Sequence, residues 1–241
     1  MLSIRENRIV SFPFVLFFSL IFVSPCKASS DIKQVTATVE RKRIVENLNR
    51  QHENINSMTA KVYQRKHLSL LKKDIHMKGT IFLQKPDMLR WETVSPERSF
   101  TVIKDKTMTV FHPDVNEAEL YKFSEHFMAR NTMHFFSSVV WGSVEGMEKR
   151  FNVEVFRRNG DIAAELKPLS KMAARYLSSI TIFYNEKTGL PTGFEVTTPK
   201  GDRTVTELTD LKVNPELRPD IFKIKLPPGV LITNRPESFD Y

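Results

Sequence analysis

The sequence is dominated by short runs of alternating polar and apolar residues, which turn residues interrupt every 10–13 positions or so. In the first half these runs are TAKVYQRKHLSL, IHMKGTIFLQK, MLRWETV, SFTVIKD and TMTVFHP. Turns such as Lys85-Pro86-Asp87, Ser95-Pro96-Glu97 and Lys104-Asp105-Lys106 separate them. A period of two is typical of strands, and connections this short join neighbouring strands in antiparallel order. The pattern therefore predicts an antiparallel β meander.

The same pattern returns in the second half of the chain. Its runs are FNVEVFR, IAAELKP, LSSITIFYN, TGFEVTT, RTVTELTDLKV and IFKIKLP. Hairpin turns are predicted at Asn159-Gly160-Asp161, Glu186-Lys187-Thr188-Gly189 and Pro199-Lys200-Gly201-Asp202. No linker-like stretch interrupts residues 29–241, which are therefore predicted to form a single domain with an irregular tail from about residue 233.

Two segments break the strand pattern and are predicted to be helices. The segment from Val39 to Asn56 places Ile44, Leu48 and Ile55 along one stripe. The segment from Lys122 to Trp141 has no proline or glycine and is unusually apolar. An antiparallel sheet with one apolar face must cover that face, and these helices are the available cover. They either complete an ordinary core or leave a cavity for an apolar ligand.

The N-terminus has the parts of a secretory signal. Arg5 and Arg8 precede an apolar run of twelve residues from Phe12 to Val23. Such a run rises about 18 Å as a helix, which is too short for a hydrocarbon core about 30 Å thick. Small residues then lead to a cut after Ala28, so residues 1–28 are predicted to be a cleaved signal peptide that exports the chain.

Cys26 is the only cysteine of the chain, and two interpretations of it remain open. In the first, it is removed with the signal. In the second, Val23-Ser24-Pro25-Cys26 is a degenerate lipoprotein box, and Cys26 becomes a lipidated N-terminus. Proline before the cysteine fits that box poorly, which favours removal. Neither interpretation allows an intramolecular disulfide.

No catalytic or cofactor-binding motif is found. The chain lacks HExxH, GxSxG and a glycine-rich phosphate loop, so no enzymatic activity, metal site or cofactor is predicted. His126 and His134 could share a helix face, but no third metal ligand accompanies them. The formal net charge of +8 suits an anionic membrane surface or an acidic partner. Nucleic acid is not expected as a partner of an exported protein.

One stretch, residues 79–92, reads GTIFLQKPDMLRWE, in which a Lys-Pro pair is followed by an Arg-Trp pair. Further along, Phe111-His112-Pro113 and Leu166-Lys167-Pro168 end two predicted strands, and residues 222–230 read FKIKLPPGV. In this order the elements resemble those of the periplasmic outer-membrane lipoprotein carriers, the LolA-like proteins. The resemblance covers about residues 40–232, although the segment KFSEHFMARNTMHFF has no close family match.

The resemblance implies a mainly β fold with some α, an incomplete and strongly curved antiparallel β-barrel closed by a helical lid. It implies a monomeric periplasmic carrier that works without a cofactor. Such carriers receive acylated lipoproteins from an inner-membrane lipoprotein-releasing ABC exporter and pass them to an outer-membrane acceptor. Shielding is needed in transit because each CH₂ removed from water gains about 0.8 kcal/mol.

The resemblance also implies site residues. Family positions that line the lipid-binding cavity correspond to Leu89, Trp91 and Phe194, and basic residues near the lid correspond to Lys85 and Arg90. Alternation within the strands and the apolar insert extend the predicted lining to Phe82, Met108, Val110, Phe127, Phe135 and Phe136. The alternative for each lining position is an ordinary place in the core.

Related roles remain open at this point. A membrane-anchored acceptor of the LolB type would require a lipidated Cys26. A lipid-sensing module of the envelope-stress regulator type would use the same half-barrel, but those regulators carry an additional C-terminal domain. A hydrolase would need a histidine or carboxylate at the mouth of the cavity.

Overall fold

The computed structural model describes residues 32–36, 38–122, 144–158 and 160–234 of the 241-residue chain. They belong to one compact unit that spans residues 31–241. The predicted signal peptide lies outside the described residues, and so does nearly all of the predicted helix from Lys122 to Trp141.

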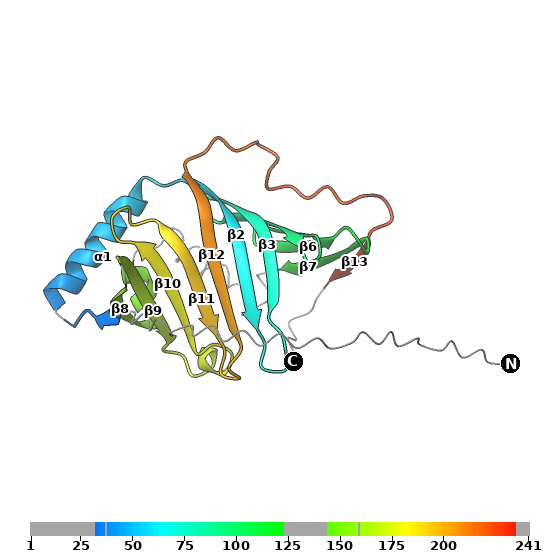
Figure 1. Cartoon of the computed structure of the whole chain (residues 1–241). Coiled ribbons are helices and arrows are strands. Elements are labelled where there is room, and N and C mark those ends of the chain that lie inside the picture. Colours follow the sequence, from blue (N-terminus) through cyan, green and yellow to red (C-terminus); the bar gives the residue numbers. More distant parts are fainter. Residues whose placement is uncertain (1–31, 37, 123–143, 159, 235–241) are drawn as a thin grey trace, which may run out of the picture. The chain divides into compact units, whose positions relative to one another are not determined.

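A single curved sheet makes up most of the described chain (Figure 1). Its strand order is β1-β8-β9-β10-β11-β12-β2-β3-β4-β5-β6-β7-β13, with β1 and β13 as open edges. All neighbours are antiparallel except β13 and β7, which pair in parallel. The strands are β1 Ile32–Gln34, β2 Ser57–His67, β3 Ile75–Gln84, β4 Met88–Ser95, β5 Ser99–Lys104, β6 Thr107–His112, β7 Glu117–Lys122, β8 Phe151–Arg158, β9 Asp161–Pro168, β10 Ser179–Asn185, β11 Pro191–Thr197, β12 Arg203–Val213 and β13 Leu231–Asn234. This unclosed, curved sheet confirms the predicted half-barrel.

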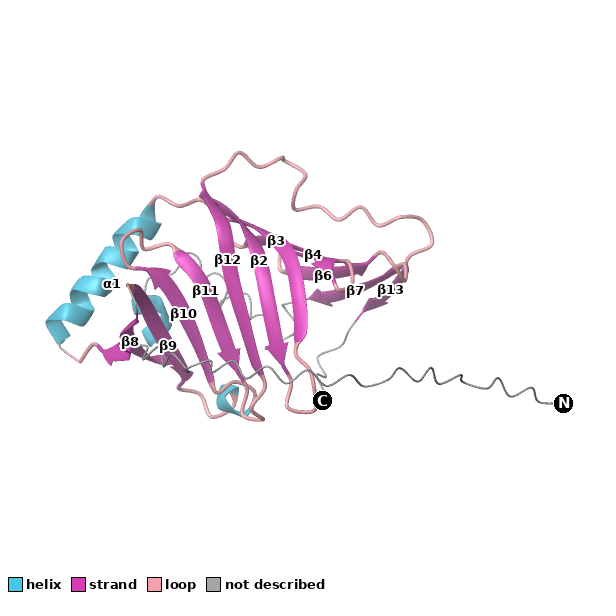
Figure 2. Cartoon of the chain, viewed as in Figure 1, coloured by secondary structure: helices cyan, strands magenta, loops and turns pink. Residues whose placement is uncertain are grey.

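Helical segments accompany the sheet among the described residues (Figure 2). Helix α1, Thr38–Glu53, confirms the predicted N-terminal helix to within three residues at its end. Helix α3, Val144–Glu148, precedes β8, and a single 3₁₀ turn, Ala173–Arg175, lies between β9 and β10.

The main core lies on the sheet face that α1 covers, which we call the inner face. Every second residue of β2 faces it, with Met58, Ala60 and Val62 all buried. The neighbouring strands continue this apolar surface, for example through Ile81 of β3 and Ile182 of β10. Helix α1 contributes Ile44 and Leu48 of the predicted stripe, because a 3.6-residue period brings them to one side of the helix. Ile55, the third predicted residue, joins the cluster from the connection that follows the helix.

The opposite, outer face carries a smaller core beneath the C-terminal segment 214–230, which runs back along the sheet. Ile221 and Phe222 of this segment pack with Val102 of β5. The prediction of a strand in IFKIKLP is wrong, because residues 221–227 contain no strand. The irregular tail was predicted to start at about residue 233, and β13 extends through Asn234. Strands β1, β7 and β13 were not predicted.

Two glycines allow the sheet to curve. A Cβ at Gly79 would lie 2.1 Å from the Glu92 carbonyl oxygen, and one at Gly193 would lie 2.3 Å from that of Thr206. Both positions adjoin register shifts, between Lys78 and Gly79 in one pair of strands and beside Gly193 in the other. Bulges bend a strand and increase its twist, and here glycine permits the close backbone approach that the bend creates.

Candidate functional site

Five of the predicted lining residues share the inner face. Leu89 of β4 lies opposite Ile103 of β5, which in turn lies opposite Met108 of β6. Two residues further along β4, Trp91 lies opposite Thr101 of β5, which lies opposite Val110 of β6. Leu89 is buried, whereas Trp91, Met108 and Val110 are half-buried. The sheet register thus gathers residues from three strands into one apolar surface.

Phe194 joins this surface from the other half of the sheet. It lies on β11 opposite Ile182, a buried residue of the main core. Together with Leu208 of β12 and Ala60 of β2 it lines an apolar cavity on the inner face. Only about 20 Å³ of that cavity is open, which is room for about one water molecule. An acyl chain therefore needs part of the cover to move.

Phe82 was predicted to line the same cavity, and this prediction is wrong. Its neighbours Ile81 and Leu83 face inward, and side chains alternate along a strand, so Phe82 points to the outer face. There it packs against the cluster formed by Val102, Ile221 and Phe222. The predicted lining residues Phe127, Phe135 and Phe136 lie outside the described residues.

Polar contacts tie the first half of helix α1 to the sheet. Arg157 of β8 forms ion pairs with Glu40 of α1 and with Glu186 in the β10–β11 connection. Its Nη2 lies 2.8 Å from a Glu186 carboxylate oxygen. Arg41 of α1 pairs with Glu148 of α3. All of these side chains are about a third exposed or more, so each pair contributes little to the free energy of unfolding. These ion pairs orient α1 on the sheet but add little to its stability there.

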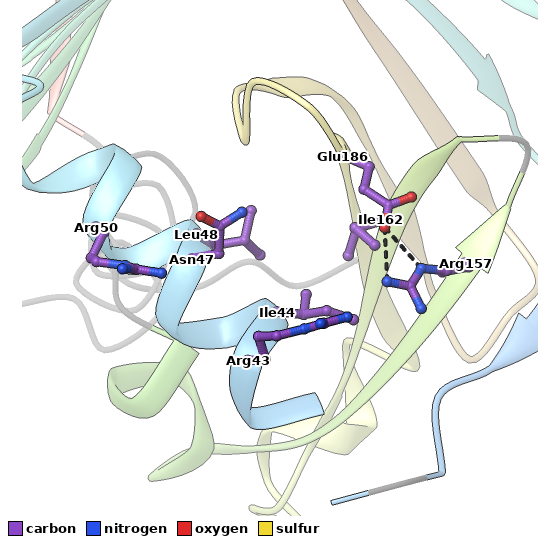
Figure 3. Close-up of a pocket in the computed structure, with 8 residues that line it drawn as sticks. All are labelled: Arg43, Ile44, Asn47, Leu48, Arg50, Arg157, Ile162 and Glu186. Carbon is purple, nitrogen blue, oxygen red and sulfur yellow. Dashed lines mark hydrogen bonds and ion pairs between the residues drawn. The ribbon is translucent and has the colours of Figure 1, made fainter. Parts of the chain in front are cut away.

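A pocket of about 320 Å³ opens beside these contacts, between α1 and the sheet (Figure 3). Figure 3 shows Arg43, Asn47 and Arg50 projecting from α1, with the Arg157–Glu186 pair on the opposite side. Apolar side chains are limited to Ile44, Leu48 and Ile162, the last buried in β9. This charged pocket is unlike the apolar inner face and is poorly suited to an acyl chain.

The C-terminal end of α1 is held by His52 and Lys85. The His52 ring is buried, and its Nε2–H donates to the Gly189 carbonyl oxygen at 2.9 Å. Its Nδ1 has no hydrogen-bond partner among the described residues. Desolvation by burial lowers the pKa of His52 below 6.5, and the positive charge of Lys85 lowers it further, against the opposing effect of the Gly189 hydrogen bond. The imidazole is therefore neutral at pH 7.

Lys85, the predicted lid-latch residue before a proline, contacts the C-terminal end of α1, and its role as a latch stays a prediction. Its Nζ donates to the Glu53 carbonyl oxygen at 3.3 Å, at the last residue of α1. Its backbone N–H donates to the Asn56 carbonyl oxygen at 2.8 Å. A cation at a helix C-terminus interacts favourably with the helix dipole, so Lys85 favours the docked position of α1.

Arg90 has a different place from the one predicted. It lies on the outer face, where its Nη1 donates to the Ile221 carbonyl oxygen at 3.1 Å and the Lys223 carbonyl oxygen at 3.3 Å. Its Nε donates to Glu92, and its guanidinium stands 5.2 Å from the centre of the Phe100 ring. The predicted lid latch at Arg90 is wrong, because these contacts anchor the C-terminal segment rather than a cover of the inner face.

Lys66 is an inner-face residue that the sequence analysis missed. It continues the alternation of Val62 and Gln64 along β2, and it lies opposite Thr204 of β12. Burial lowers the pKa of its ammonium, and it forms no ion pair with a described residue. The signal was present in the sequence, since Met58 to Lys66 repeats with period two. A cation at the end of an apolar surface can meet the polar end of a bound amphiphile.

The described residues contain no group of three or more His, Cys, Asp or Glu side chains that could hold a metal ion. Over the same residues, no helix has the length and apolar character needed to span a membrane.

A curved, open sheet with a helix packed against its apolar inner face places the protein in the class of β half-barrels. The family model described as outer membrane lipoprotein carrier protein LolA matches residues 53–225. This span is well over half of the chain, and the chain belongs to the LolA family.

Individual relatives are distant. The outer-membrane lipoprotein carrier protein of Pseudomonas fluorescens (strain Pf0-1) is 24% identical over 151 residues, which cover 63% of this chain and 69% of the relative. That of Legionella pneumophila (strain Corby) is 26% identical over 152 residues, covering 63% and 71%. Among solved structures, an uncharacterized conserved protein from Thermus thermophilus aligns with a TM-score of 0.49 at 12% identity, covering 81% of this chain and 99% of that one.

Proposed function

We propose that the protein is a periplasmic carrier that shields the acyl chains of lipoproteins on the inner face and shuttles them from the inner to the outer membrane. The observation that carries the proposal is the apolar surface that the inner face presents from β9 to β6, with α1 packed against part of it. Membership of the LolA family supports lipoproteins as the cargo. The partners would be a lipoprotein-releasing ABC exporter and an outer-membrane acceptor.

The physical requirement of such a carrier is reversible shielding. Each acyl CH₂ transferred from water gains about 0.8 kcal/mol, so the cargo must stay covered in transit. The cavity beside Phe194 has only about 20 Å³ open, so we propose that α1 moves when chains enter there. The exposed ion pairs that position α1 are weak enough to break when cargo binds.

The experiment compares cargo loading in variants that place a charge on either face of the sheet. Trp91→Glu and Met108→Glu put a carboxylate among half-buried inner-face residues, and Val94→Glu puts one at an exposed position of β4. Native mass spectrometry of the purified chains, with thermal unfolding as a check of folding, measures bound acylated cargo. We expect loading to fall at least tenfold in both inner-face variants and to persist in Val94→Glu. Equal loading in all chains would refute the assignment of the inner face.

Mass spectrometry of the N-terminus separates the shuttle from an anchored acceptor. A mature chain that begins after Ala28 would agree with a carrier free to cross the periplasm. A lipidated Cys26 would instead identify a membrane-anchored acceptor with the same half-barrel.

A further inference from the structure

Exposed apolar side chains concentrate in two connections of the sheet. Among the described residues, eleven large apolar side chains are exposed, and five of them lie in the β2–β3 connection (68–74) and the β9–β10 connection (169–178). Leu70 is 94% exposed and is followed by Leu71, while the second connection presents Leu169, Met172 and Tyr176. An exposed apolar cluster of this kind marks a surface that another body covers.

The two connections belong to one rim of the molecule. Figure 2 shows them at the same end of the strands, on either side of the β11–β12 turn (198–202). The Ser69 N–H donates to the Asp202 carboxylate at 2.7 Å, which joins the β2–β3 connection to the β11–β12 turn. The Ser178 N–H donates at 2.8 Å to the carbonyl oxygen of Thr197, the last residue of β11 before that turn. We call these three connections the loop rim.

The loop rim is also basic. Lys72 and Lys73 follow the two leucines, and Lys171 and Arg175 alternate with the apolar residues of the β9–β10 connection. All four are exposed, and none forms an ion pair with a described residue. The rim has two carboxylates, Asp74 and Asp202, and the β11–β12 turn adds a further cation, Lys200. Five basic side chains against two carboxylates give the rim a net positive charge among its apolar side chains.

We propose that the loop rim docks the protein reversibly on the surface of a bilayer that contains anionic lipid. Leucine, methionine and tyrosine side chains insert at the boundary of headgroups and acyl chains, while lysine and arginine remain at the level of the phosphates. A second copy of the chain fits this surface poorly, since two such basic rims would repel each other. The proposal concerns the empty protein and stands whether or not the inner face binds acyl chains.

The test measures sedimentation of the purified chain with vesicles that contain one third phosphatidylglycerol and two thirds phosphatidylcholine. The rim variant carries Leu70→Ser, Leu71→Ser, Met172→Ser and Tyr176→Ser, and the matched control carries Val39→Ser and Leu231→Ser, exposed apolar residues outside the rim. We expect the partition coefficient of the rim variant to fall at least tenfold and that of the control to stay within twofold. Binding of wild type should weaken at high salt and on pure phosphatidylcholine.

A second measurement reads contact at the rim directly, so that attachment through the N-terminus cannot mask the result. In a Cys26→Ser background, an environment-sensitive fluorophore on Leu70→Cys should shift to the blue on addition of the anionic vesicles. The same fluorophore on Val39→Cys should not respond. No shift at Leu70, equal losses in rim and control variants, or a concentration-dependent dimer that the rim variant lacks would each overturn the proposal.

Discussion

Replacing Leu48 by alanine tests whether α1 is a movable cover or a fixed part of the core. Leu48 is 5% exposed and belongs to the main cluster on the inner face. The substitution removes three buried carbon atoms, which corresponds to about 2.4 kcal/mol of lost transfer free energy. The residual cavity adds to this, so the free energy of docking α1 should fall by roughly 2.5–5 kcal/mol.

The two possibilities differ in where this loss is measured. If α1 opens while the sheet stays folded, a loss of about 2.4 kcal/mol increases the open population about 50-fold. Amide hydrogen exchange should then accelerate in α1 before it does in β2 or β10, and binding of the apolar dye N-phenyl-1-naphthylamine should increase. Val39→Ala is the control, because Val39 is 84% exposed on the same helix, and it should change neither quantity. Equal acceleration across helix and sheet, with unchanged dye binding, would refute a movable α1.

Three further outcomes follow from single contacts. The unfolded chain binds a proton at His52 near pH 6.5 and the folded chain only at lower pH, so the free energy of unfolding should decrease as pH falls below 6.5. Urea titrations at a series of pH values should show that this free energy depends less on pH in His52→Gln than in the wild type. Arg90→Ala removes charged hydrogen bonds to the C-terminal segment and should cost about 1.5–3 kcal/mol of stability, with faster proteolysis within residues 214–230. The control Arg98→Ala breaks only the exposed pair with Asp114 and should leave the melting temperature and the proteolysis nearly unchanged. Gly79→Ala forces a Cβ against the Glu92 carbonyl and should lower stability by about 1–3 kcal/mol in thermal unfolding, and an unchanged melting temperature would contradict the close approach.

The alternation of polar and apolar residues predicted the strands well where one face of the sheet is buried and the other is exposed to solvent. Strand β2, with buried residues at every second position, is such a case. The edge strand β13 gives no such signal, because all four of its residues are exposed and only its backbone pairs with β7. The segment 221–227 shows the opposite failure. Its Phe222, Ile224 and Leu226 alternate with lysines as in a strand, yet they pack on the outer face without a pairing partner.

The site was predictable only as far as the register of each strand was known. Within β4, alternation correctly placed Leu89 and Trp91 on one face, and the same alternation puts Arg90 on the other. Phe82 was assigned to the lining from alternation, but the alternation was taken in the wrong register, because Phe82 sits between two inward-facing residues. A shift of one residue reverses the face, so a period of two does not by itself say which face is the inner one. The loop rim was not predictable, since it depends on connections far apart in sequence meeting at one end of the sheet.

The inner and outer clusters lie on opposite faces of the sheet, so α1, which we propose to move, packs apart from the C-terminal segment. No described buried residue belongs to both the inner and the outer cluster. Arg90 and the C-terminal segment hold the outer face of β4 and β5, while His52 and Lys85 hold α1 over the inner face. Because contacts that share no partners contribute nearly independently to stability, loosening α1 leaves the outer cluster in place. The curved sheet can therefore keep its register while its inner face is uncovered, as the carrier function that we propose would require.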